Sequence, residues 1–309
     1  MRFLRLLSVT LVLGLGAQAI PILSSCSHGA YSALISFGDS FTDNGNGAWV
    51  VSNHSWPANP NYFGGRFSNG PVWTEFIAGN LSIPLIDYAV GGATTSNSLV
   101  QGYTGPSSSI PVHSIDEQVH RFIASPPAAL RDTESSRPLF TLLGGLNDFF
   151  FNPNVTGAQS AQKILATRAL LAAVYPKARI LVLDYPRATC FPYAAYVDDA
   201  GREALETFGK ELRAHLLAAA VGAQPSGAGA FTFVDMEPLF EQFQPDGAPE
   251  VYGFTEDGAK GSCLTGAYGE TPTVTLCDNA PERVWWDEYH PTTHSHSWVA
   301  ALVLNALGV

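Results

Sequence analysis

A serine and a histidine at opposite ends of the sequence are the residue types that ester hydrolysis needs. Ser40 closes the tetrad Phe-Gly-Asp-Ser at 37–40, and His290 lies three residues after Asp287. A serine hydroxyl becomes a good nucleophile when an imidazole takes its proton, and a carboxylate fixes the tautomer and orientation of that imidazole. A loose helical turn would put Asp287 and His290 on one side. Each motif alone is equally typical of an ordinary turn, so their meaning depends on what lies between them.

The elements that must position these residues follow from composition and hydrophobic pattern. The chain of 309 residues is 46% hydrophobic and 14% charged, which excludes a disordered or fibrous protein. Short apolar runs are typical of buried parallel strands, and they alternate with helical stretches and loops. This pattern predicts one domain with a doubly wound α/β sheet. We expect strands at 33–37, 85–90, 139–143, 180–183 and 231–234, helices at 158–174, 203–221 and 297–307, and long loops at 96–111 and 244–280.

Three segments with polar or glycine residues follow the first three predicted strands. Ser40 follows the first strand, the pair Gly91 and Gly92 the second, and the segment 144–148 with Asn147 the third. In such sheets the ligand site forms at the carboxyl ends of the strands. Glycine N–H groups and a carboxamide are donors suited to an oxyanion. Because Gly91 and Gly92 are adjacent, the choice between them stays open.

The order Gly-Asp-Ser, Gly-Gly, Gly-x-Asn-Asp and Asp-x-x-His resembles the GDSL, or SGNH, hydrolase family, whose four blocks supply serine, glycine, asparagine and histidine. The resemblance covers nearly the whole chain after residue 19. It implies a flavodoxin-like three-layer α/β/α sandwich with a five-stranded parallel sheet. It also implies that Ser40 is the nucleophile and that His290, with the carboxylate of Asp287, is the base. The oxyanion donors it implies are Ser40, Gly92 and Asn147. Phe41 stands where the family usually has leucine, and no Gly-x-Ser-x-Gly motif of the α/β-hydrolase fold is present.

Two segments, 37–46 and 65–73, resemble the fungal secreted acetylesterases of carbohydrate esterase family 16. This resemblance implies deacetylation of hemicellulose-derived oligosaccharides, with an acetylated carbohydrate or another small ester as the substrate. Aromatic residues in the loop after Ser40 are suited to stacking on sugar faces: Trp49, Trp56, Tyr62 and Phe67. The alternative is that these rings form a small cluster that buries the loop.

Two other functions stay open. A GDSL lipase or phospholipase would act on longer acyl esters, although no long apolar loop segment provides a trough for them. A secreted carbohydrate-binding protein could keep the fold without turnover, although all five site residues are present.

The amino-terminal residues predict secretion. Basic residues at 2 and 5, an apolar run at 6–16 and Ala-Gln-Ala at 17–19 are typical of a signal peptide at 1–19, which leaves one hydrolase domain at 20–309. Sequons at Asn53, Asn80 and Asn154 predict glycosylation and disfavour Cys26 as a lipid anchor. The net charge of −11 disfavours nucleic acid and anionic membranes as partners. We expect an extracellular monomer.

The cysteines and remaining charged residues predict structural roles. In an oxidising compartment four cysteines form two disulfides, with Cys263–Cys277 as the local bridge and Cys26–Cys190 as the other, although all three connectivities stay open. A zinc site at His290, His294 and His296 lacks a fourth ligand, so we expect no metal and no cofactor. The acids Asp39, Asp43 and Asp148 lie among glycines and asparagines, and we expect them to hold turns rather than act in catalysis.

Overall fold

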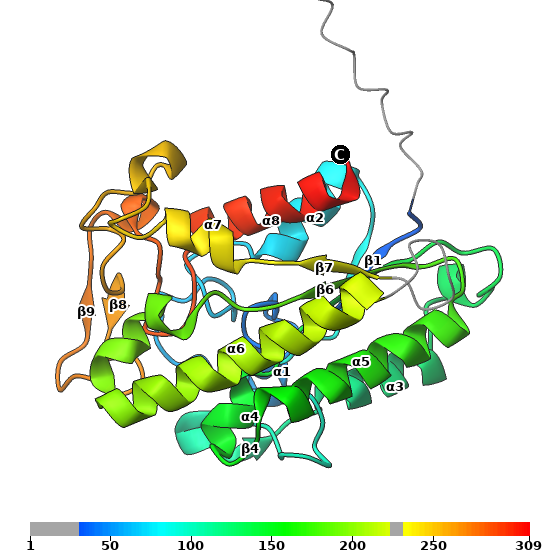
Figure 1. Cartoon of the computed structure of the whole chain (residues 1–309), viewed down its shortest axis with the longest axis horizontal. Helices are drawn as coiled ribbons and strands as arrows, with labels where there is room; N and C mark the ends of the chain where they lie inside the picture. Colours follow the sequence, from blue (N-terminus) through cyan, green and yellow to red (C-terminus); the bar gives the residue numbers. More distant parts are fainter. Residues whose placement is uncertain (1–30, 223–230) are drawn as a thin grey trace, which may run out of the picture.

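A five-stranded parallel sheet forms the centre of the molecule (Figure 1). The computed structural model describes residues 31–222 and 231–309. The strand order is β2-β1-β5-β6-β7, which is the flavodoxin-like order and confirms the predicted doubly wound α/β fold. The strands are β1 (Leu34–Gly38), β2 (Leu85–Asp87), β5 (Leu139–Leu143), β6 (Arg179–Leu183) and β7 (Thr232–Val234).

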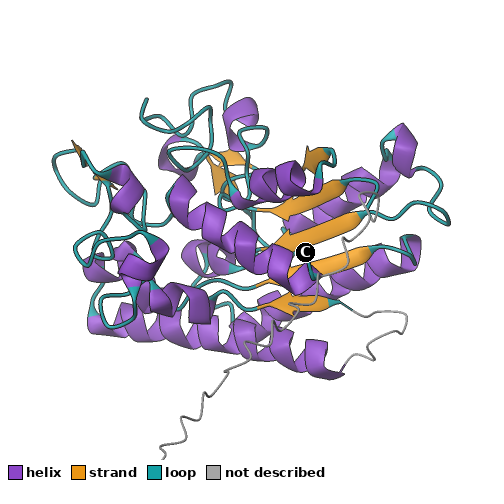
Figure 2. Cartoon of the chain, turned by 90° about the horizontal axis from the view of Figure 1, so that it is seen from above, coloured by secondary structure: helices purple, strands orange, loops and turns teal. Residues whose placement is uncertain are grey.

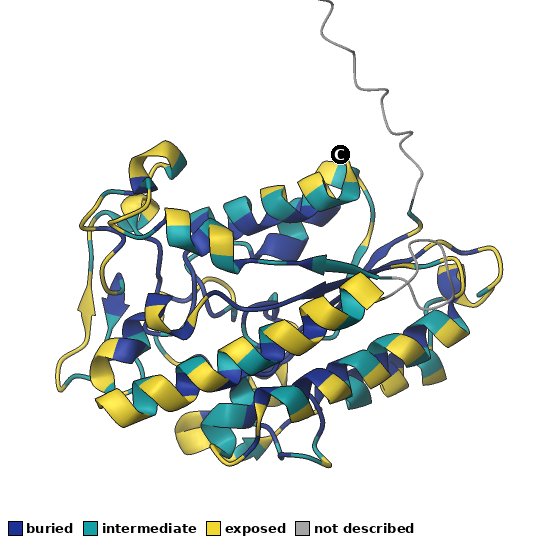
Figure 3. Cartoon of the chain, in the orientation of Figure 1, coloured by how far each residue is buried: buried dark blue, intermediate teal, exposed yellow. Residues whose placement is uncertain are grey.

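The central strands are apolar because helices cover both of their faces. All five residues of β1 and all five of β5 are buried, and the two strands pair in register from Leu34 with Leu139 to Gly38 with Leu143. Figure 3 shows the buried sheet between helices whose outer faces are exposed. Burial on both faces is therefore the physical reason for the continuous hydrophobic runs.

Helices form a layer on each side of the sheet (Figures 1 and 2). One layer holds α3 (Ile115–Ala124), α5 (Gly157–Val174) and α6 (Asp199–Gly222), and the other holds α2 (Trp73–Leu81) and α8 (Thr293–Leu307). Helix α5 begins at a capping box, in which the Thr156 hydroxyl accepts from the Gln159 N–H while the Gln159 side chain accepts from the Thr156 N–H.

The other elements are short and lie mainly in the loops. The helices are α1 (Ala48–Val51), α4 (Leu146–Phe151) and α7 (Glu237–Gln242), and the two small hairpins pair β3 (Tyr103–Thr104) with β4 (Ile110–Pro111) and β8 (Leu264–Thr265) with β9 (Thr275–Leu276). Single 3₁₀ turns cover Pro106–Ser108, Ala128–Leu130, Ala188–Cys190, Pro192–Tyr196, Pro249–Tyr252 and Ala280–Glu282. The predicted loops at 96–111 and 244–280 thus contain the two hairpins.

The structure differs from the sequence prediction mainly at element ends. Strand β2 ends at Asp87 rather than at residue 90, although the N–H groups of Tyr88 and Val90 still donate to carbonyls of β1, at 2.9 and 3.1 Å. Helix α8 begins at Thr293 rather than at residue 297, because the Thr292 hydroxyl caps it by accepting the Ser295 N–H at 3.2 Å. Among the described residues, no helix is long and apolar enough to cross a membrane.

Candidate active site

Ser40 lies in a tight turn directly after β1. The N–H groups of Thr42 and Asp43 both donate to the Asp39 carbonyl, at 3.0 and 2.9 Å. The half-buried Ser40 faces a cavity at the edge where the parallel strands end. The turn therefore presents the hydroxyl where a substrate can approach it.

Asp287 and His290 lie in a bend before α8, not in the helical turn suggested by their spacing. The Trp286 N–H donates to the His290 carbonyl at 2.7 Å, and this bond closes the bend. Oδ1 of Asp287 accepts the N–H groups of Tyr289 and His290, each at 2.8 Å. The Asp287 carboxylate thus organises its own loop and brings the imidazole against itself.

The three side chains form one hydrogen-bonded line. Nδ1 of His290 lies 2.8 Å from both carboxylate oxygens of Asp287, so the ring carries its proton there. Nε2 is then an acceptor, and the Ser40 hydroxyl donates to it at 2.7 Å. This arrangement can draw the proton from Ser40 as its oxygen attacks a carbonyl.

The backbone N–H groups of Ser40 and Gly92 have no acceptor in the described part of the chain, and both residues line the cavity. The neighbouring Gly91 N–H instead donates to Asp43 at 2.9 Å. The geometry therefore favours Gly92 over Gly91 as the second oxyanion donor.

Asn147 lies in the first turn of α4 and also lines the cavity. Its carboxamide donates to the Ala93 carbonyl at 3.0 Å and lies 3.3 Å from the Asp39 carboxylate. The Ala93 bond fixes the amide, and the longer contact to Asp39 is the one that a substrate oxygen can replace.

Asp39 and Asp43 are buried and hold the loops around Ser40. Asp39 accepts the Phe41 N–H at 3.1 Å and the Tyr185 hydroxyl, and burial raises the pKa of Asp39 to about 6. The Asp43 carboxylate accepts four backbone N–H groups, those of Gly45, Gly47, Ala48 and Gly91. Asp43 therefore joins the Ser40 turn to the loop that carries Gly92.

Asp148 supports the same loop and yields a pH-dependent prediction. It accepts the N–H and hydroxyl of Thr95, and burial raises its pKa from 3.8 to about 7. Because the pKa is raised in the folded state, the carboxyl's stabilising contribution is complete below about pH 4 and is lost as the pH rises to about 7. We therefore expect the free energy of unfolding of Asp148→Asn, measured relative to that of wild type, to be higher at pH 8 than at pH 5. Urea unfolding of both proteins at both pH values measures this difference. If the difference between variant and wild type is the same at pH 5 and pH 8, the raised pKa of Asp148 is contradicted.

The cavity at Ser40 has a volume of about 420 Å³ and is lined mainly by aromatic rings. Five of them form a continuous aromatic wall, with neighbouring ring centres 4.8–5.8 Å apart: Trp56, Tyr268, Tyr289, Tyr193 and Phe150. Leu146 is the single aliphatic side chain in the lining of this cavity. The lining is thus mainly aromatic rather than aliphatic, and it includes several tyrosines.

The four aromatic residues expected to bind substrate divide into two pairs. Trp56 and Phe67 line the cavity, and Phe67 packs on His290 with ring centres 5.0 Å apart. Trp49 and Tyr62 do not line it, which corrects the expectation. Trp49 packs over Gly65 and beside His54, while Tyr62 is buried with its hydroxyl bonded to Asp287 at 2.6 Å.

Much of the aromatic wall was missed by sequence reasoning. Phe150 follows Asn147 within the same short helix, so the aromatic run after the motif was an available signal. Tyr193 and Tyr268 come from separate loops, and nothing in their spacing points to the site.

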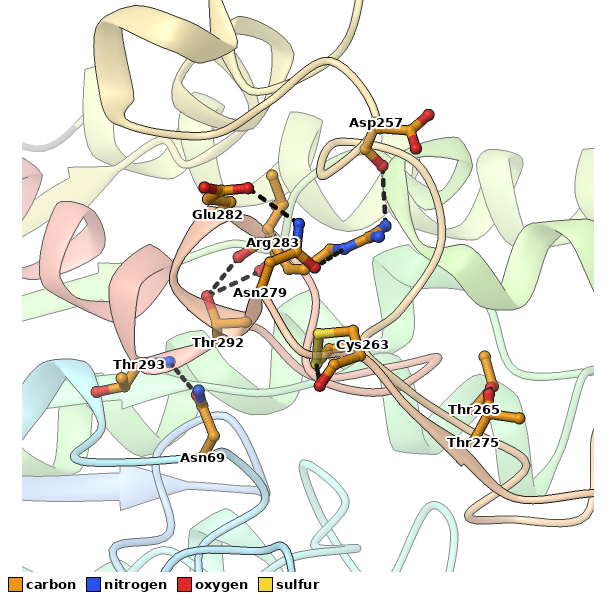
Figure 4. The surroundings of a disulfide bond; sticks show 12 residues. Asn69, Asp257, Cys263, Thr265, Thr275, Asn279, Glu282, Arg283, Thr292 and Thr293 are labelled. Atoms are coloured by element: carbon orange, nitrogen blue, oxygen red, sulfur yellow. Dashed lines mark hydrogen bonds between the residues drawn. A yellow bond between two sulfur atoms is a disulfide. The ribbon is translucent and has the colours of Figure 1, made fainter.

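The loop that carries Tyr268 is held by the predicted disulfide between Cys263 and Cys277. Figure 4 shows that Arg283 next to it donates to the Asp257 carbonyl, while the Thr292 hydroxyl donates to the Arg283 carbonyl. The N–H groups of Cys263 and Leu264 donate to the carbonyls of Trp285 and Trp286, at 3.0 and 2.6 Å, and these bonds tie the disulfide loop to the bend that carries His290.

The second disulfide, the signal peptide and the glycosylation sites were also predicted from the sequence. Cys190 is buried and forms no disulfide with a described residue, and Cys26 lies outside the described residues, as does the signal peptide at 1–19. That second pairing stays a prediction. The sequon residues Asn53, Asn80 and Asn154 are all exposed.

The three histidines of the rejected zinc site have separate surroundings. His294 bonds to the Pro281 carbonyl, whereas His296 is buried behind Phe41, and burial lowers the pKa of His296 to about 3. Within residues 31–222 and 231–309, no three side chains of His, Cys, Asp or Glu converge as metal ligands.

Comparison with known proteins gives both a family match and individual relatives. The family model described as GDSL-like Lipase/Acylhydrolase matches residues 34–303. The thermolabile hemolysin of Vibrio parahaemolyticus is 30% identical over 282 residues, which cover 88% of this chain and 63% of the hemolysin. An acetylesterase of Hypocrea jecorina is 26% identical over 137 residues, covering 43% of this chain and 39% of that enzyme. The chain therefore spans less than two thirds of the length of either relative.

A solved structure is also similar to this chain. It is a family two carbohydrate esterase of Myceliophthora fergusii with its carbohydrate binding domain, at 16% identity and a TM-score of 0.49, covering 90% of this chain and 67% of that one.

Proposed function

The chain belongs to the GDSL-like lipase/acylhydrolase family, and we propose that it is a carboxylic ester hydrolase that works through an acyl-enzyme at Ser40. The observation that carries this proposal is the hydrogen-bonded line from Asp287 through His290 to Ser40 at the cavity. The finer proposal is an acetylesterase that acts on hemicellulose-derived oligosaccharides.

The proposed reaction has two symmetrical halves. Oγ of Ser40 attacks the ester carbonyl while its proton passes to Nε2 of His290, and the carbonyl electrons move to the oxygen. The N–H groups of Ser40 and Gly92 and the Asn147 amide donate to that oxyanion. As the intermediate collapses, His290 gives the proton to the leaving alcohol, and the acyl group stays on Ser40. Water then repeats the sequence, with His290 as its base, and releases the acid.

The cavity lining supports a sugar ester over a long acyl chain. Aromatic rings stack on the C–H faces of sugars, and tyrosine hydroxyls can hydrogen-bond to sugar hydroxyls. The aromatic wall offers both, whereas Leu146 is the single aliphatic contact in this lining. The likeness to the acetylesterase of Hypocrea jecorina supports an acetyl group as the acyl part of the substrate.

The alternative function is a lipase or phospholipase that acts on longer acyl chains. It is favoured by the family model, whose description, GDSL-like Lipase/Acylhydrolase, names lipases. An aromatic cavity can accommodate either substrate in part, so acyl length is the property that separates the two proposals.

We expect activity to be highest on the acetyl ester when p-nitrophenyl acetate, butyrate and longer esters are compared by kcat/KM. Acetate release from acetylated xylo- and manno-oligosaccharides, with Ser40→Ala as the inactive control, tests the sugar. A maximum above butyrate would overturn the acetylesterase and favour the lipase.

We also propose that the protein is a secreted, glycosylated monomer. The exposed sequons and the Cys263–Cys277 disulfide support an oxidising, extracellular location. The net charge of −11 supports the absence of nucleic acid and anionic membrane partners.

A further inference from the structure

Tyr62 lies in the loop between α1 and α2, outside all four family motifs, and yet its hydroxyl reaches the catalytic carboxylate. It donates to Oδ2 of Asp287 at 2.6 Å across 225 residues of sequence. We propose that Tyr62 is a positioning residue, which holds the Asp287 carboxylate with both oxygens towards the His290 imidazole. This inference rests on the proposed function of Asp287 and His290.

The two oxygens of Asp287 are held differently. Oδ1 accepts two backbone N–H groups, those of Tyr289 and His290. Oδ2 accepts no backbone N–H within the described ranges, so its donors there are the Tyr62 hydroxyl and the imidazole itself. Because Asp287 is fully buried, no solvent replaces a missing donor. Among the described residues, the Tyr62 hydroxyl is therefore the donor to Oδ2 that does not belong to the base itself, and it fixes the orientation of the carboxylate.

The Tyr62 ring is itself held by packing. It meets Trp286 and Phe67 edge-on, at ring-centre distances of 6.4 and 6.3 Å, and it packs in a cluster with the disulfide-bonded Cys263. Phe67 packs in turn on the His290 ring. Tyr62 thus bonds to the carboxylate of Asp287 and also packs on Phe67, the ring that supports the base His290.

The hydroxyl also remains a donor at every pH at which the enzyme would work. Burial and the nearby Asp287 carboxylate raise the pKa of Tyr62 well above its usual value. Other titratable groups near Asp287 come from the disulfide loop and the catalytic bend: Tyr268, Glu270, Glu288 and Tyr289. The Tyr268 hydroxyl also lies beside the Tyr62 hydroxyl, so Tyr62→Phe removes that contact as well and leaves the side chains of the other three groups unchanged.

The variant Tyr62→Phe separates positioning from packing, because it keeps the ring and removes the hydroxyl. A hydrogen bond to a charged group contributes enough that we expect kcat to fall about ten- to hundredfold. KM should stay within about twofold, because Tyr62 does not line the cavity. With one donor lost, Asp287 interacts more strongly with the protonated imidazole. The acid limb of the kcat/KM profile should therefore move to higher pH.

The experiment compares wild type, Tyr62→Phe, Tyr175→Phe and Ser40→Ala on p-nitrophenyl acetate. For the proteins that keep Ser40, rates are divided by the number of sites that a fluorophosphonate titrates, so that misfolded protein does not count, and the Ser40→Ala rate is divided by the protein concentration. Tyr175 is a matched control, because it is buried beside Phe122 and Phe140 in the hydrophobic core and does not line the cavity. We expect its variant to keep the wild-type kcat and pH profile.

The inference is overturned if Tyr62→Phe keeps kcat within twofold of wild type, or if its acid limb coincides with that of wild type. Either result would leave Tyr62 a packing residue only, while Ser40-dependent activity of the wild type would still support the proposed function. A wild type without Ser40-dependent activity would overturn the proposed function and this inference together.

Discussion

Replacing His290 with alanine should lower kcat by about a thousandfold or more. His290 is the group that can take the Ser40 proton, since Nε2 accepts the hydroxyl at 2.7 Å, and losses in such triads have effects of this size. Steady-state rates on p-nitrophenyl acetate measure it. KM should change much less, because the acyl and alcohol contacts of the cavity remain.

His113→Ala is the matched control for this prediction. His113 is exposed and pairs with Glu117 on the surface, so its loss should leave kcat near that of wild type. Near-normal turnover by His290→Ala would reject His290 as the base.

Gly92→Ala should lower kcat by about a hundredfold or more. A Cβ at this position would lie 1.9 Å from the Tyr103 carbonyl oxygen, and the φ of +87° is one that alanine rarely adopts. The loop must therefore shift and take the Gly92 N–H away from the oxyanion, and the loss of one such donor costs about 10²–10³ in kcat. The quantity to measure is the kcat of the variant per active site, with the number of correctly folded sites taken from active-site titration.

Gly79→Ala provides the control, because a Cβ there meets no atom within 4 Å and Gly79 lies within helix α2. It should keep full activity and gain slightly in stability. A Gly92→Ala variant as active as Gly79→Ala would mean that the Gly92 N–H does not bind the oxyanion.

The sheet was predictable from sequence because its strands are buried on both faces. The run at 139–143 matches β5 at both ends, since every one of its side chains is buried. The ends of β2 and α8 were less predictable. Strand β2 ends at Asp87 although Tyr88 and Val90 still donate to β1, and the Thr292 cap starts α8 earlier than its apolar residues suggest.

The site residues were predictable where they directly follow a predicted strand. Ser40, Gly92 and Asn147 each follow a strand, so parallel topology brings them to one edge. The hydrogen bond from Tyr62 to Asp287 could not be predicted in this way. Tyr62 reaches it through a loop whose path depends on packing against Trp286. A stacking role for Tyr62 was the natural expectation from sequence, and burial of its ring removes that role.

The central claim is that Ser40 is the nucleophile of this hydrolase. The most direct measurement is reaction with a fluorophosphonate, followed by intact mass and peptide mapping. We expect one adduct per molecule, located on Ser40, with loss of esterase activity in proportion to labelling, and no adduct on Ser40→Ala. An adduct on another residue, or Ser40→Ala that retains wild-type esterase activity, would contradict it.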